Sequence, residues 1–330
     1  MNTTKKTVAL ISGGAGCEHD ISVLSAKNVL NLIDRSRYDV LDVFIEKDGT
    51  WYIREGDRLT PTFPTRLGKS RGFIYKTSLI DVDVAIPCLH GDLGEDGTVQ
   101  GALTIAGISY VGEDVYASAI TQDKIYTKLC AVSLGIPTAD FVFFNGESTK
   151  EAQAITAKHL GFPVIIKPSR LGSSHGIRIA RCAEEFSAAY SNALSLSKRL
   201  LVEKLIDFDH ELECAYLLGR FAPFGRVLSG GSFYDFDSKY SSNTRTDVCS
   251  GMDTEIENKA RDHAAALVRA LGIRTLSRID FLVTVDGKVY FNEINAFPGM
   301  TDTSLYPRLT EEMSLKRGEF IDLLIEDAIS

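Results

Sequence analysis

The stretch Ser277–Asn295, SRIDFLVTVDGKVYFNEIN, decides the fold, because two runs of strand-forming residues flank the dipeptide Asp286-Gly287. Asp-Gly between such runs is the strongest short-range signal of a β-hairpin with a two-residue turn. A turn of this length pairs Val285 with Lys288 and fixes the register of both strands. The pairs that it places on one face of the hairpin are Asp280 with Glu293 and Arg278 with Asn295.

The pair formed by Asp280 and Glu293 sets two carboxylates opposite each other. At about 5 Å and an effective dielectric of about 20, two such charges repel by about 3 kcal/mol. A divalent cation would remove this repulsion, since Mg²⁺ binds one or two carboxylates together with phosphate oxygens, and Asn295 adds a neutral oxygen. The alternative is a solvated hairpin whose carboxylates turn into water. The turn Pro298–Thr301, which exposes backbone groups directly after the hairpin, favours the metal site.

The first third of the chain is predicted to form a parallel sheet with helices. The expected elements are a strand over Thr7–Ser12, a glycine-rich turn over Gly13–Gly16, a helix over Ile21–Leu32, and strands over Val40–Ile45 and Val82–Cys88, followed by a loop over His90–Gly97 and a helix over Thr98–Ala106. Functional loops of such sheets lie at the carboxyl ends of the strands, where both glycine-rich segments fall.

The rest of the chain is predicted to form two further regions. The second contains a helix over Ala117–Leu134, a β-hairpin formed by Phe162–Pro168 and Ile177–Ala180, a helix over Glu184–Ser195 and a strand over Leu200–Ile206. The third contains an antiparallel strand pair and helices over Ile256–Leu271 and Glu319–Ile329. We therefore expect an α/β (α+β) protein with three domains, residues 1–112, 113–206 and 207–330, of which the first has a Rossmann-like parallel sheet.

Composition argues against several classes of protein. The 330 residues are 44% hydrophobic and 24% charged, which is typical of a globular chain. A formal net charge of −8 argues against broad binding to nucleic acid or anionic lipid. No apolar run approaches the roughly 18 residues of a membrane helix, and the polar start of the chain has no secretory signal. The six scattered cysteines form no C-x-x-C pair, so we expect neither zinc nor disulfides in a soluble, cytoplasmic protein.

Two common nucleotide-binding motifs are incomplete. Gly13–Gly16 lacks the last glycine of G-x-G-x-x-G, because that position is His19. Gly68-Lys69-Ser70 resembles the end of a P-loop, yet Phe63 stands where its first glycine should be. Neither motif is therefore used to predict a nucleotide site.

Weaker patterns indicate where charged ligands could bind. Lys167 ends an apolar strand and precedes Gly172–Ser174, and a lysine, serine hydroxyls and loop N–H groups together can bind phosphate. Lys124, on a predicted helix, is by itself more typical of a surface residue. Glu18 precedes the first helix, and the acidic, glycine-rich segment His90–Gly97 is suited to binding an amine. Helix capping and an ordinary turn are the alternatives for these two.

Five motifs follow one another along nearly the whole chain, from about Val8 to Leu309. They are Gly13-Gly14 with Glu18-His19 and Ser22, HGDLGEDGTVQG at His90–Gly101, IIKPSRLGSS at Ile165–Ser174, FYDFDSKY at Phe233–Tyr240 and NEINAFPGMT at Asn292–Thr301. In this order they resemble the D-alanine:D-alanine ligase family, whose members have the ATP-grasp fold. Departures from the family pattern include Gly16 in place of serine, His175 in place of valine and a spacing from Glu203 to Glu211 that is one residue longer.

The resemblance implies a role for each matching residue. ATP would bind between the central and C-terminal domains, at Lys124, Lys167, Ser174, Glu203, Lys204, Ile206, Glu211, Phe233 and Lys239. Two Mg²⁺ ions, or Mn²⁺ in their place, would bind Asp280, Glu293 and Asn295. The first D-alanine would contact Glu18, His90 and Glu95, and the second Arg278, Gly299, Ser304 and Leu305. Glu18, Ser173, Tyr240 and Arg278 would be the catalytic residues.

The resemblance also implies the reaction, which is the ATP-dependent ligation of two D-alanines through an acyl phosphate for peptidoglycan precursor synthesis. Tyr240 favours a dipeptide product, because relatives that make the D-lactate ester lack it. A D-alanine:D-serine ligase of the vancomycin-resistance type is one alternative. A non-catalytic nucleotide sensor is another, which the presence of Arg278, Asp280 and Glu293 disfavours. The family further implies a homodimer.

Overall fold

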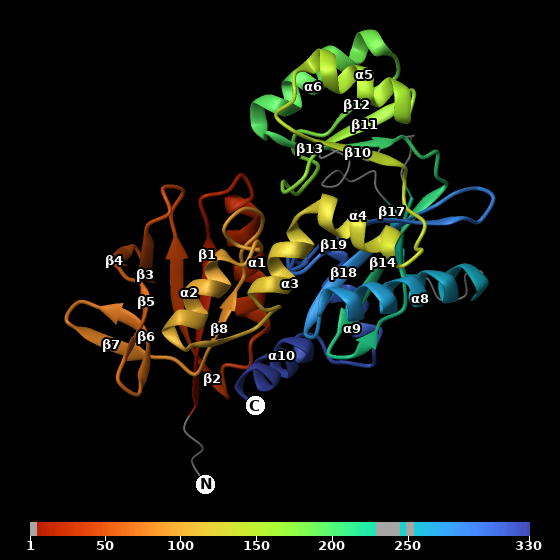
Figure 1. The fold of residues 1–330 in the computed structure, drawn as a ribbon. Coiled ribbons are helices and arrows are strands. Elements are labelled where there is room, and N and C mark those ends of the chain that lie inside the picture. Colours follow the sequence, from red (N-terminus) through yellow and green to blue (C-terminus); the bar gives the residue numbers. More distant parts are fainter. Residues whose placement is uncertain (1–4, 229–244, 249–253) are drawn as a thin grey trace.

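The computed structural model describes residues 5–228, 245–248 and 254–330, and within them the strands form four sheets (Figure 1). The first sheet has the order β4-β3-β2-β1-β8-β9. Its strands are β1 (Lys6–Gly13), β2 (Tyr38–Ile45), β3 (Trp51–Glu55), β4 (Arg58–Pro61), β8 (Val84–Pro87) and β9 (Ser109–Tyr110). β1, β2, β8 and β9 pair in parallel, so the predicted parallel sheet is confirmed.

The central strand β1 explains why this sheet forms. Residues 8–13 of β1 are all buried, as expected of an apolar strand covered on both faces of a parallel sheet. The helices α1 (His19–Leu32) and α2 (Thr98–Ala106) follow β1 and β8. Because the loops that precede them leave the carboxyl ends of neighbouring parallel strands, both loops lie at one edge of the sheet.

A small three-stranded sheet, which the sequence analysis did not predict, precedes β8 (Figure 1). Its strands are β5 (Pro64–Leu67), β6 (Ser70–Tyr75) and β7 (Ser78–Asp81). Gly68 has a positive φ of 62° in the tight turn between β5 and β6, which explains the segment that resembles a P-loop. A Cβ on Gly72 would lie 1.9 Å from the Ile80 carbonyl oxygen, so this position requires glycine.

Two helices, α3 (Val115–Gln122) and α4 (Lys124–Ser133), replace the single helix predicted over Ala117–Leu134. The break is at Asp123, whose backbone is extended, with φ −92° and ψ 103°. Its side chain caps α4 by accepting a hydrogen bond from the Ile125 N–H at 3.1 Å. The break sets the start of α4, and with it Lys124, against the loop that follows β11.

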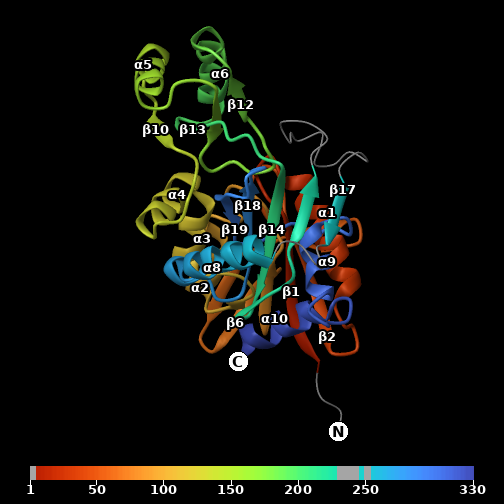
Figure 2. The same ribbon diagram turned by 90° about the vertical axis from the view of Figure 1, so that its right-hand side faces the viewer.

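The four-stranded sheet is antiparallel, with the order β10-β13-β11-β12. Its strands are β10 (Phe141–Asn145), β11 (Val164–Pro168), β12 (Arg178–Ala180) and β13 (Arg199–Lys204). The predicted β11–β12 hairpin is confirmed. α5 (Thr149–His159) and α6 (Ala183–Leu196) lie side by side on one face of the sheet, and the other face is turned toward β14, β18 and β19 (Figures 1 and 2).

The last sheet has the order β17-β16-β14-β18-β19, with β15 paired to β14. Its strands are β14 (His210–Leu217), β15 (Arg220–Phe221), β16 (Gly225–Leu228), β17 (Arg245–Val248), β18 (Leu276–Val283) and β19 (Val289–Asn295). The helices α8 (Thr254–Leu271) and α9 (Leu305–Glu311) pack against it, at β19 and β14. The last helix, α10 (Glu319–Ile329), packs against α1, β8 and β9 of the first sheet.

The β18–β19 hairpin corrects the sequence prediction at its turn. Val283 pairs with Val289, so the loop is longer than two residues, and the predicted pair of Val285 with Lys288 is wrong. A β-bulge at Asn292 then shifts the register by one residue. Beyond the bulge, Asp280 faces Glu293 and Arg278 faces Asn295, as predicted.

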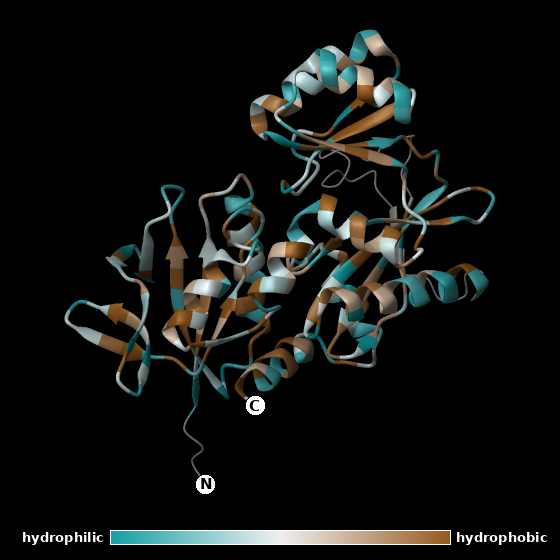
Figure 3. Cartoon of the chain, viewed as in Figure 1, coloured by the Kyte–Doolittle hydropathy of each residue, from teal (hydrophilic) through white to brown (hydrophobic). Residues whose placement is uncertain are grey.

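The hydrophobic residues of the chain lie mainly between the layers. In Figure 3 brown is most continuous in the strands of the four-stranded sheet, while other strands mix brown with white and teal, and the helices change between brown and teal along their length, as amphipathic helices do. Among the residues that the structure describes, no helix combines the length and the apolar character needed to cross a membrane. The division into domains at residues 112 and 206 stays our proposal, which the distribution of strands among the sheets supports.

Candidate active site

Two adjoining cavities lie where the sheets meet. The inter-sheet cavity, between the four-stranded sheet and strands β18 and β19, has an empty volume of about 810 Å³. The loop cavity is lined by the loops that follow β1, β8 and β19 and is larger, at about 1960 Å³. Lys124, Gly172, Ser173 and Glu293 line both cavities. A ligand in one cavity can therefore meet a ligand in the other at this shared wall.

A buried charge cluster lines the inter-sheet cavity. Glu203 on β13 forms ion pairs with Lys128 of α4 and, at 2.6 Å, with Lys167 of β11. Burial alone raises the pKa of Glu203, but the two lysines outweigh it and lower this pKa to about 2. One carboxylate between two ammonium groups gives the cluster a net charge of +1, which favours an anion in the cavity.

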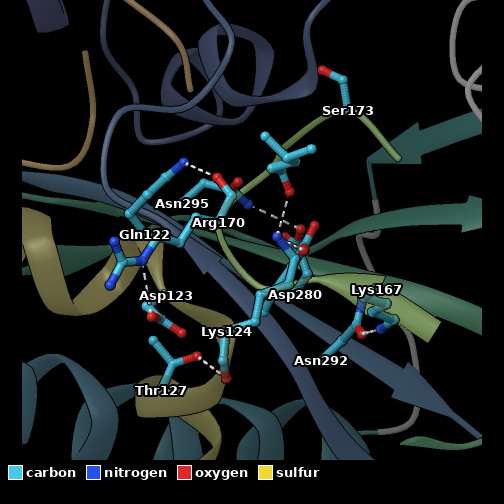
Figure 4. Close-up of polar contacts among 12 residues, drawn as sticks. Gln122, Asp123, Lys124, Thr127, Lys167, Arg170, Ser173, Asp280, Asn292 and Asn295 are labelled. Carbon is cyan, nitrogen blue, oxygen red and sulfur yellow. Dashed lines mark hydrogen bonds and ion pairs between the residues drawn. The ribbon is translucent and has the colours of Figure 1, made fainter. Parts of the chain in front are cut away.

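The two lysines of this cluster differ in how many of their N–H groups are occupied. Lys128 Nζ also donates to Thr138 Oγ1 at 2.7 Å and to the Phe291 carbonyl at 3.2 Å. Lys167 Nζ donates to Asn292 Oδ1 at 3.1 Å (Figure 4). Lys167 was predicted from the sequence, whereas Lys128 was not, because its one signal is its i+4 spacing from Lys124 on the same helix face.

The loop after β11 is fixed to the start of α4 (Figure 4). Lys124 Nζ donates to the Leu171 carbonyl at 2.8 Å and lies 3.5 Å from a carboxylate oxygen of Glu293. Arg170 Nε donates to the buried carboxylate of Asp123 at 3.1 Å. These contacts hold Lys124 at the wall that the two cavities share.

The tip of the same loop reaches the loop cavity. Ser173 and Ser174 have positive φ values of 48° and 58°, and the Ser173 hydroxyl donates to Glu18 Oε1. A Cβ on Gly172 would lie 2.5 Å from Glu18 Oε2, so glycine permits this close approach. Glu18 and Ser173, which were both predicted as catalytic residues, are therefore in direct contact, although they follow strands of different sheets.

The acidic corner of the loop cavity contains Glu18, His90 and Glu95. Glu95 Oε2 accepts a hydrogen bond from the Gly91 N–H at 2.7 Å. Burial, together with the charge of Glu18, raises the pKa of Glu95 to about 8. Burial lowers the pKa of His90, whose Nε2 lies 2.9 Å from Ser25 Oγ. An ammonium group bound here would relieve the crowding of carboxyl groups.

Arg278 on β18 is held between two carboxylates. It donates to both oxygens of Asp280, at 2.8 and 2.7 Å, and its Nε lies 3.2 Å from Glu213 Oε2. Burial lowers the pKa of Arg278, but Asp280 and Glu213 outweigh this effect and raise it. Asn295 Nδ2 donates to Asp280 Oδ2 at 3.3 Å (Figure 4). The register aligns Glu213, Asp280 and Glu293 across β14, β18 and β19.

The loop after β19 closes the loop cavity on the side of α9. Gly299, Ser304 and Leu305 all line it, as predicted for one binding site. Ser304 Oγ accepts a hydrogen bond from the Thr301 N–H at 3.1 Å. The Met300 N–H donates to Ser25 Oγ at 3.3 Å, which ties this loop to α1.

The remaining predicted residues fall into two groups, and two further residues of the site were not predicted. Ser174, Glu203, Lys204, Ile206 and Glu211 line the inter-sheet cavity, so the longer spacing before Glu211 does not remove it from this cavity. Phe233, Lys239 and Tyr240 lie outside the described residues. Glu213 and Asn292 were missed, because Glu213 depends on the pairing of β14 with β18 and Asn292 on the bulge.

The oxygen ligands near the shared wall fit a hard divalent ion. Among the described residues, no three His, Cys, Asp or Glu side chains form a closed metal cage. Asp280 and Glu293 are nevertheless directly opposed, and Asn295 contacts Asp280. Mg²⁺ commonly binds one or two carboxylates together with phosphate oxygens rather than an all-protein cage. These residues therefore fit an ion that arrives with a phosphate ligand.

An antiparallel sheet that carries lysines over a second sheet that carries carboxylates, with a cavity between them, defines an ATP-grasp protein. The chain belongs to the D-alanine–D-alanine ligase family. Two family models match it, "D-ala D-ala ligase N-terminus" over residues 7–113 and "D-ala D-ala ligase C-terminus" over residues 130–326.

Curated relatives and solved structures agree with this assignment. The chain is 35% identical to a D-alanine–D-alanine ligase of Thermoanaerobacter sp. (98% of this chain, 97% of the relative) and 34% identical to one of Deinococcus radiodurans (98% and 99%). It is similar to the VanG D-Ala:D-Ser ligase of Enterococcus faecalis, with a TM-score of 0.88, 30% identity and coverage of 98% and 100%. The D-alanyl-alanine synthetase A of Vibrio cholerae gives a TM-score of 0.86, 29% identity and 99% coverage of both chains. The predicted fold, family and ligase class are confirmed.

Proposed function

We propose that this enzyme uses ATP to join two D-alanines into D-alanyl-D-alanine, a peptidoglycan precursor. The observation that carries the proposal is the shared wall, where Lys124 and Glu293 border both cavities. A nucleotide in the inter-sheet cavity would direct its terminal phosphate toward this wall. An amino acid in the loop cavity could then offer its carboxylate to that phosphate. The names of the relatives supply the identity of the substrates.

The residues around the inter-sheet cavity are assigned to ATP. Lys124 and Lys167 would bind the phosphates, since both ammonium groups border the cavity and belong to buried, charged networks. The adenosine side would be formed by Glu203, Lys204, Ile206 and Glu211, with Phe233 and Lys239 added from the family pattern. Asp280, Glu293 and Asn295 would hold Mg²⁺, which neutralises charge on the transferred phosphoryl group when bound.

The residues around the loop cavity are assigned to the two amino acids. Glu18, His90 and Glu95 would receive the ammonium of the first D-alanine, which the crowded carboxyl groups favour. Arg278, Gly299, Ser304 and Leu305 would bind the second D-alanine. Ser173 orients Glu18 through its hydroxyl, and Tyr240 would extend this hydrogen-bonded unit.

The proposed reaction has two steps. The carboxylate of the first D-alanine attacks the terminal phosphate of ATP, which gives an acyl phosphate and ADP. The amine of the second D-alanine, having lost a proton, then attacks the acyl carbon and releases inorganic phosphate. Arg278 would stabilise the oxyanion of the tetrahedral intermediate. Water must be excluded meanwhile, because it would hydrolyse the acyl phosphate.

Phosphate release and product analysis test this proposal. We expect release of phosphate from ATP only when D-alanine is present, with D-alanyl-D-alanine identified by mass spectrometry and L-alanine as the inactive control. A folded protein that releases no phosphate with D-alanine and Mg²⁺ would contradict this proposal, and one that releases none when D-serine is added as well would leave the nucleotide-sensor alternative. The cytoplasmic location and the homodimer remain part of the proposal, the second to be measured by light scattering.

A D-alanine:D-serine ligase is the second candidate. The similarity to VanG, at 30% identity over 98% of this chain, favours it. Incubation with equal D-alanine and D-serine distinguishes the two, because the mixed dipeptide differs in mass from D-alanyl-D-alanine. We expect the D-alanine dipeptide to dominate, and an excess of the mixed dipeptide would replace the first candidate by the second.

A further inference from the structure

Lys128 is a buried charge to which the proposed reaction gives no role. Its side chain and that of Glu203 are each only 2% exposed, and they form a direct ion pair. The ammonium group has three N–H donors, and it has three partners: Glu203, Thr138 and the Phe291 carbonyl. Lys128 is therefore fully engaged by the protein and has no donor left for a phosphate.

Lys167 is placed differently in the same cluster. Both lysines line the inter-sheet cavity, but the Lys167 side chain is 10% exposed against 2% for Lys128. Among the described residues the Lys167 ammonium has two partners, Glu203 at 2.6 Å and Asn292 at 3.1 Å. One N–H donor therefore remains for a ligand. Glu203 alone would neutralise Lys167, and the cavity would lose its positive charge. With Lys128 present, the same carboxylate is shared between two cations.

We propose that Lys128 is a positioning residue of the nucleotide site, which neutralises Glu203 so that Lys167 keeps a positive charge for the phosphates of ATP. The inference rests on the proposed function, because it places the ATP phosphates in the inter-sheet cavity. Lys128 acts through Glu203 and does not touch the nucleotide. The affinity for phosphates then follows the net charge of the three side chains, which is +1 in the natural protein.

Calorimetric titration of the full chain with ATP, ADP and adenosine tests this dependence on charge. Lys128→Met reduces the cluster charge to zero, and we expect affinity for ATP and ADP to fall at least about tenfold, with adenosine affected less than about twofold. Lys158→Met is the matched control, because Lys158 is an exposed lysine in the last turn of α5 and its loss changes the net charge of the protein equally. The control should bind all three ligands as the natural protein does.

Two variants of Glu203 separate charge from packing. Lys128→Met with Glu203→Gln restores a cluster charge of +1, and the ratio of ADP to adenosine affinity should return to within about threefold of the natural value. Removing both partners of a buried pair also costs less stability than removing one, so this variant should fold even where Lys128→Met does not. Glu203→Gln alone raises the charge to +2 and should raise the same ratio.

The ratio of affinities decides the outcome. The inference would be overturned by equal losses for ADP and adenosine in Lys128→Met. It would also be overturned by a ratio in the double variant that stays as low as in Lys128→Met, or by a ratio in Glu203→Gln that does not exceed the natural value, since Lys128 would then only pack the site. A natural protein that binds neither ATP nor adenosine would overturn the proposed function together with this inference. ATP binding without D-alanine-dependent phosphate release would contradict only the proposed function.

Discussion

Glu203, which is buried, and Glu95, which is half-buried, lie on opposite sides of the shared wall, and their pKa values are shifted in opposite directions. Burial raises both, but Lys128 and Lys167 bring the pKa of Glu203 down to about 2. At Glu95 burial acts together with the charge of Glu18, and the pKa rises to about 8. In the inter-sheet cavity two lysine side chains surround one carboxylate, whereas the acidic corner of the loop cavity has an excess of carboxyl groups.

This difference shows what each cavity is prepared to bind. The inter-sheet cavity has a surplus positive charge before any ligand arrives, which suits phosphates. An ammonium group that binds in the acidic corner would reduce the repulsion between its carboxyl groups, which suits the amine of an amino acid. Arg278 lies between Asp280 and Glu213 and forms the reverse of the lysine cluster, with one cation between two carboxylates. The ligand of each region supplies the charge that the region lacks.

Arg278→Ala should have the largest effect on this arrangement. The substitution removes the proposed oxyanion donor and also the guanidinium that lies between Asp280 and Glu213. Loss of one such donor reduces kcat by about 10²- to 10³-fold, so turnover should fall to near background. The measurement is D-alanine-dependent phosphate release at saturating ATP.

The control for this variant is Arg269→Ala, because Arg269 is an exposed arginine in the last turn of α8. Its activity should match that of the natural protein. ADP affinity of Arg278→Ala should also stay within about threefold, since Arg278 does not line the inter-sheet cavity. Natural rates in Arg278→Ala would remove Arg278 from the site.

Glu293→Gln should have the next largest effect, because Glu293 belongs to both cavities. The amide keeps the shape but loses the charge that would hold Mg²⁺ and that faces Lys124 at 3.5 Å. A metal ion contributes several kcal/mol to transition-state stabilisation, so we expect a loss of about 100-fold in kcat and a higher Mg²⁺ requirement. Phosphate release measured over a Mg²⁺ series checks both effects. An unchanged Mg²⁺ requirement would contradict the metal assignment.

Glu95→Gln should change the pH dependence of stability. The native carboxyl keeps its proton up to a pKa of about 8, whereas the unfolded chain loses it near 4.5. Between these values the unfolded state binds fewer protons than the native state, so stability falls as the pH rises, by at most about 1.4 kcal/mol per pH unit. The variant lacks this term. The free energy of unfolding of the variant should therefore rise relative to that of the natural protein as the pH increases from about 5 to 8.

Chemical denaturation of both proteins at several pH values measures this difference in the free energy of unfolding. Glu203 has the opposite linkage, since its lowered pKa gives stability that is present above 4.5 and lost as the pH falls toward 2. That contribution is common to both proteins and cancels in the difference. A difference that stays constant from about pH 5 to pH 8 would show that Glu95 is ionised throughout.

The hairpin shows how far local sequence signals reached. Asp286-Gly287 predicted a turn between two strands, and this turn is present. The predicted pairs of Asp280 with Glu293 and of Arg278 with Asn295 were also correct. The predicted length of the turn was wrong, because the turn is longer than two residues. The longer turn shifts the register by one residue, and the bulge at Asn292 shifts it back before Asp280 and Glu293. A bulge depends on the neighbouring strands and on where the chain must bend, so turn chemistry alone does not reveal it.

Contacts between elements far apart in the chain were the harder part to predict. The fold and many residues that line the two cavities could be predicted, because the motifs lie at strand ends. Lys128 and Glu213 could not, because each acts through an ion pair with a residue far away in the chain, Lys128 of α4 with Glu203 of β13 and Glu213 of β14 with Arg278 of β18. The single helix predicted over Ala117–Leu134 failed at Asp123, where a cap interrupts a continuous apolar pattern. Asp123 could have been recognised as a capping residue, since aspartate is favoured at that position.

Thr138→Val should have the smallest effect on nucleotide binding and gives the sharpest contrast with Lys128→Met. Thr138 Oγ1 accepts from Lys128 at 2.7 Å and donates to the Phe291 carbonyl at 2.9 Å. Its loss leaves one N–H of a buried ammonium unpaired and should lower the free energy of unfolding by about 1–3 kcal/mol. The charge of the lysine cluster does not change, so ADP affinity should stay within about threefold. Denaturation and calorimetry on the same sample measure both quantities, and a tenfold loss of ADP affinity would show that the geometry of Lys128, rather than its charge, controls the nucleotide site.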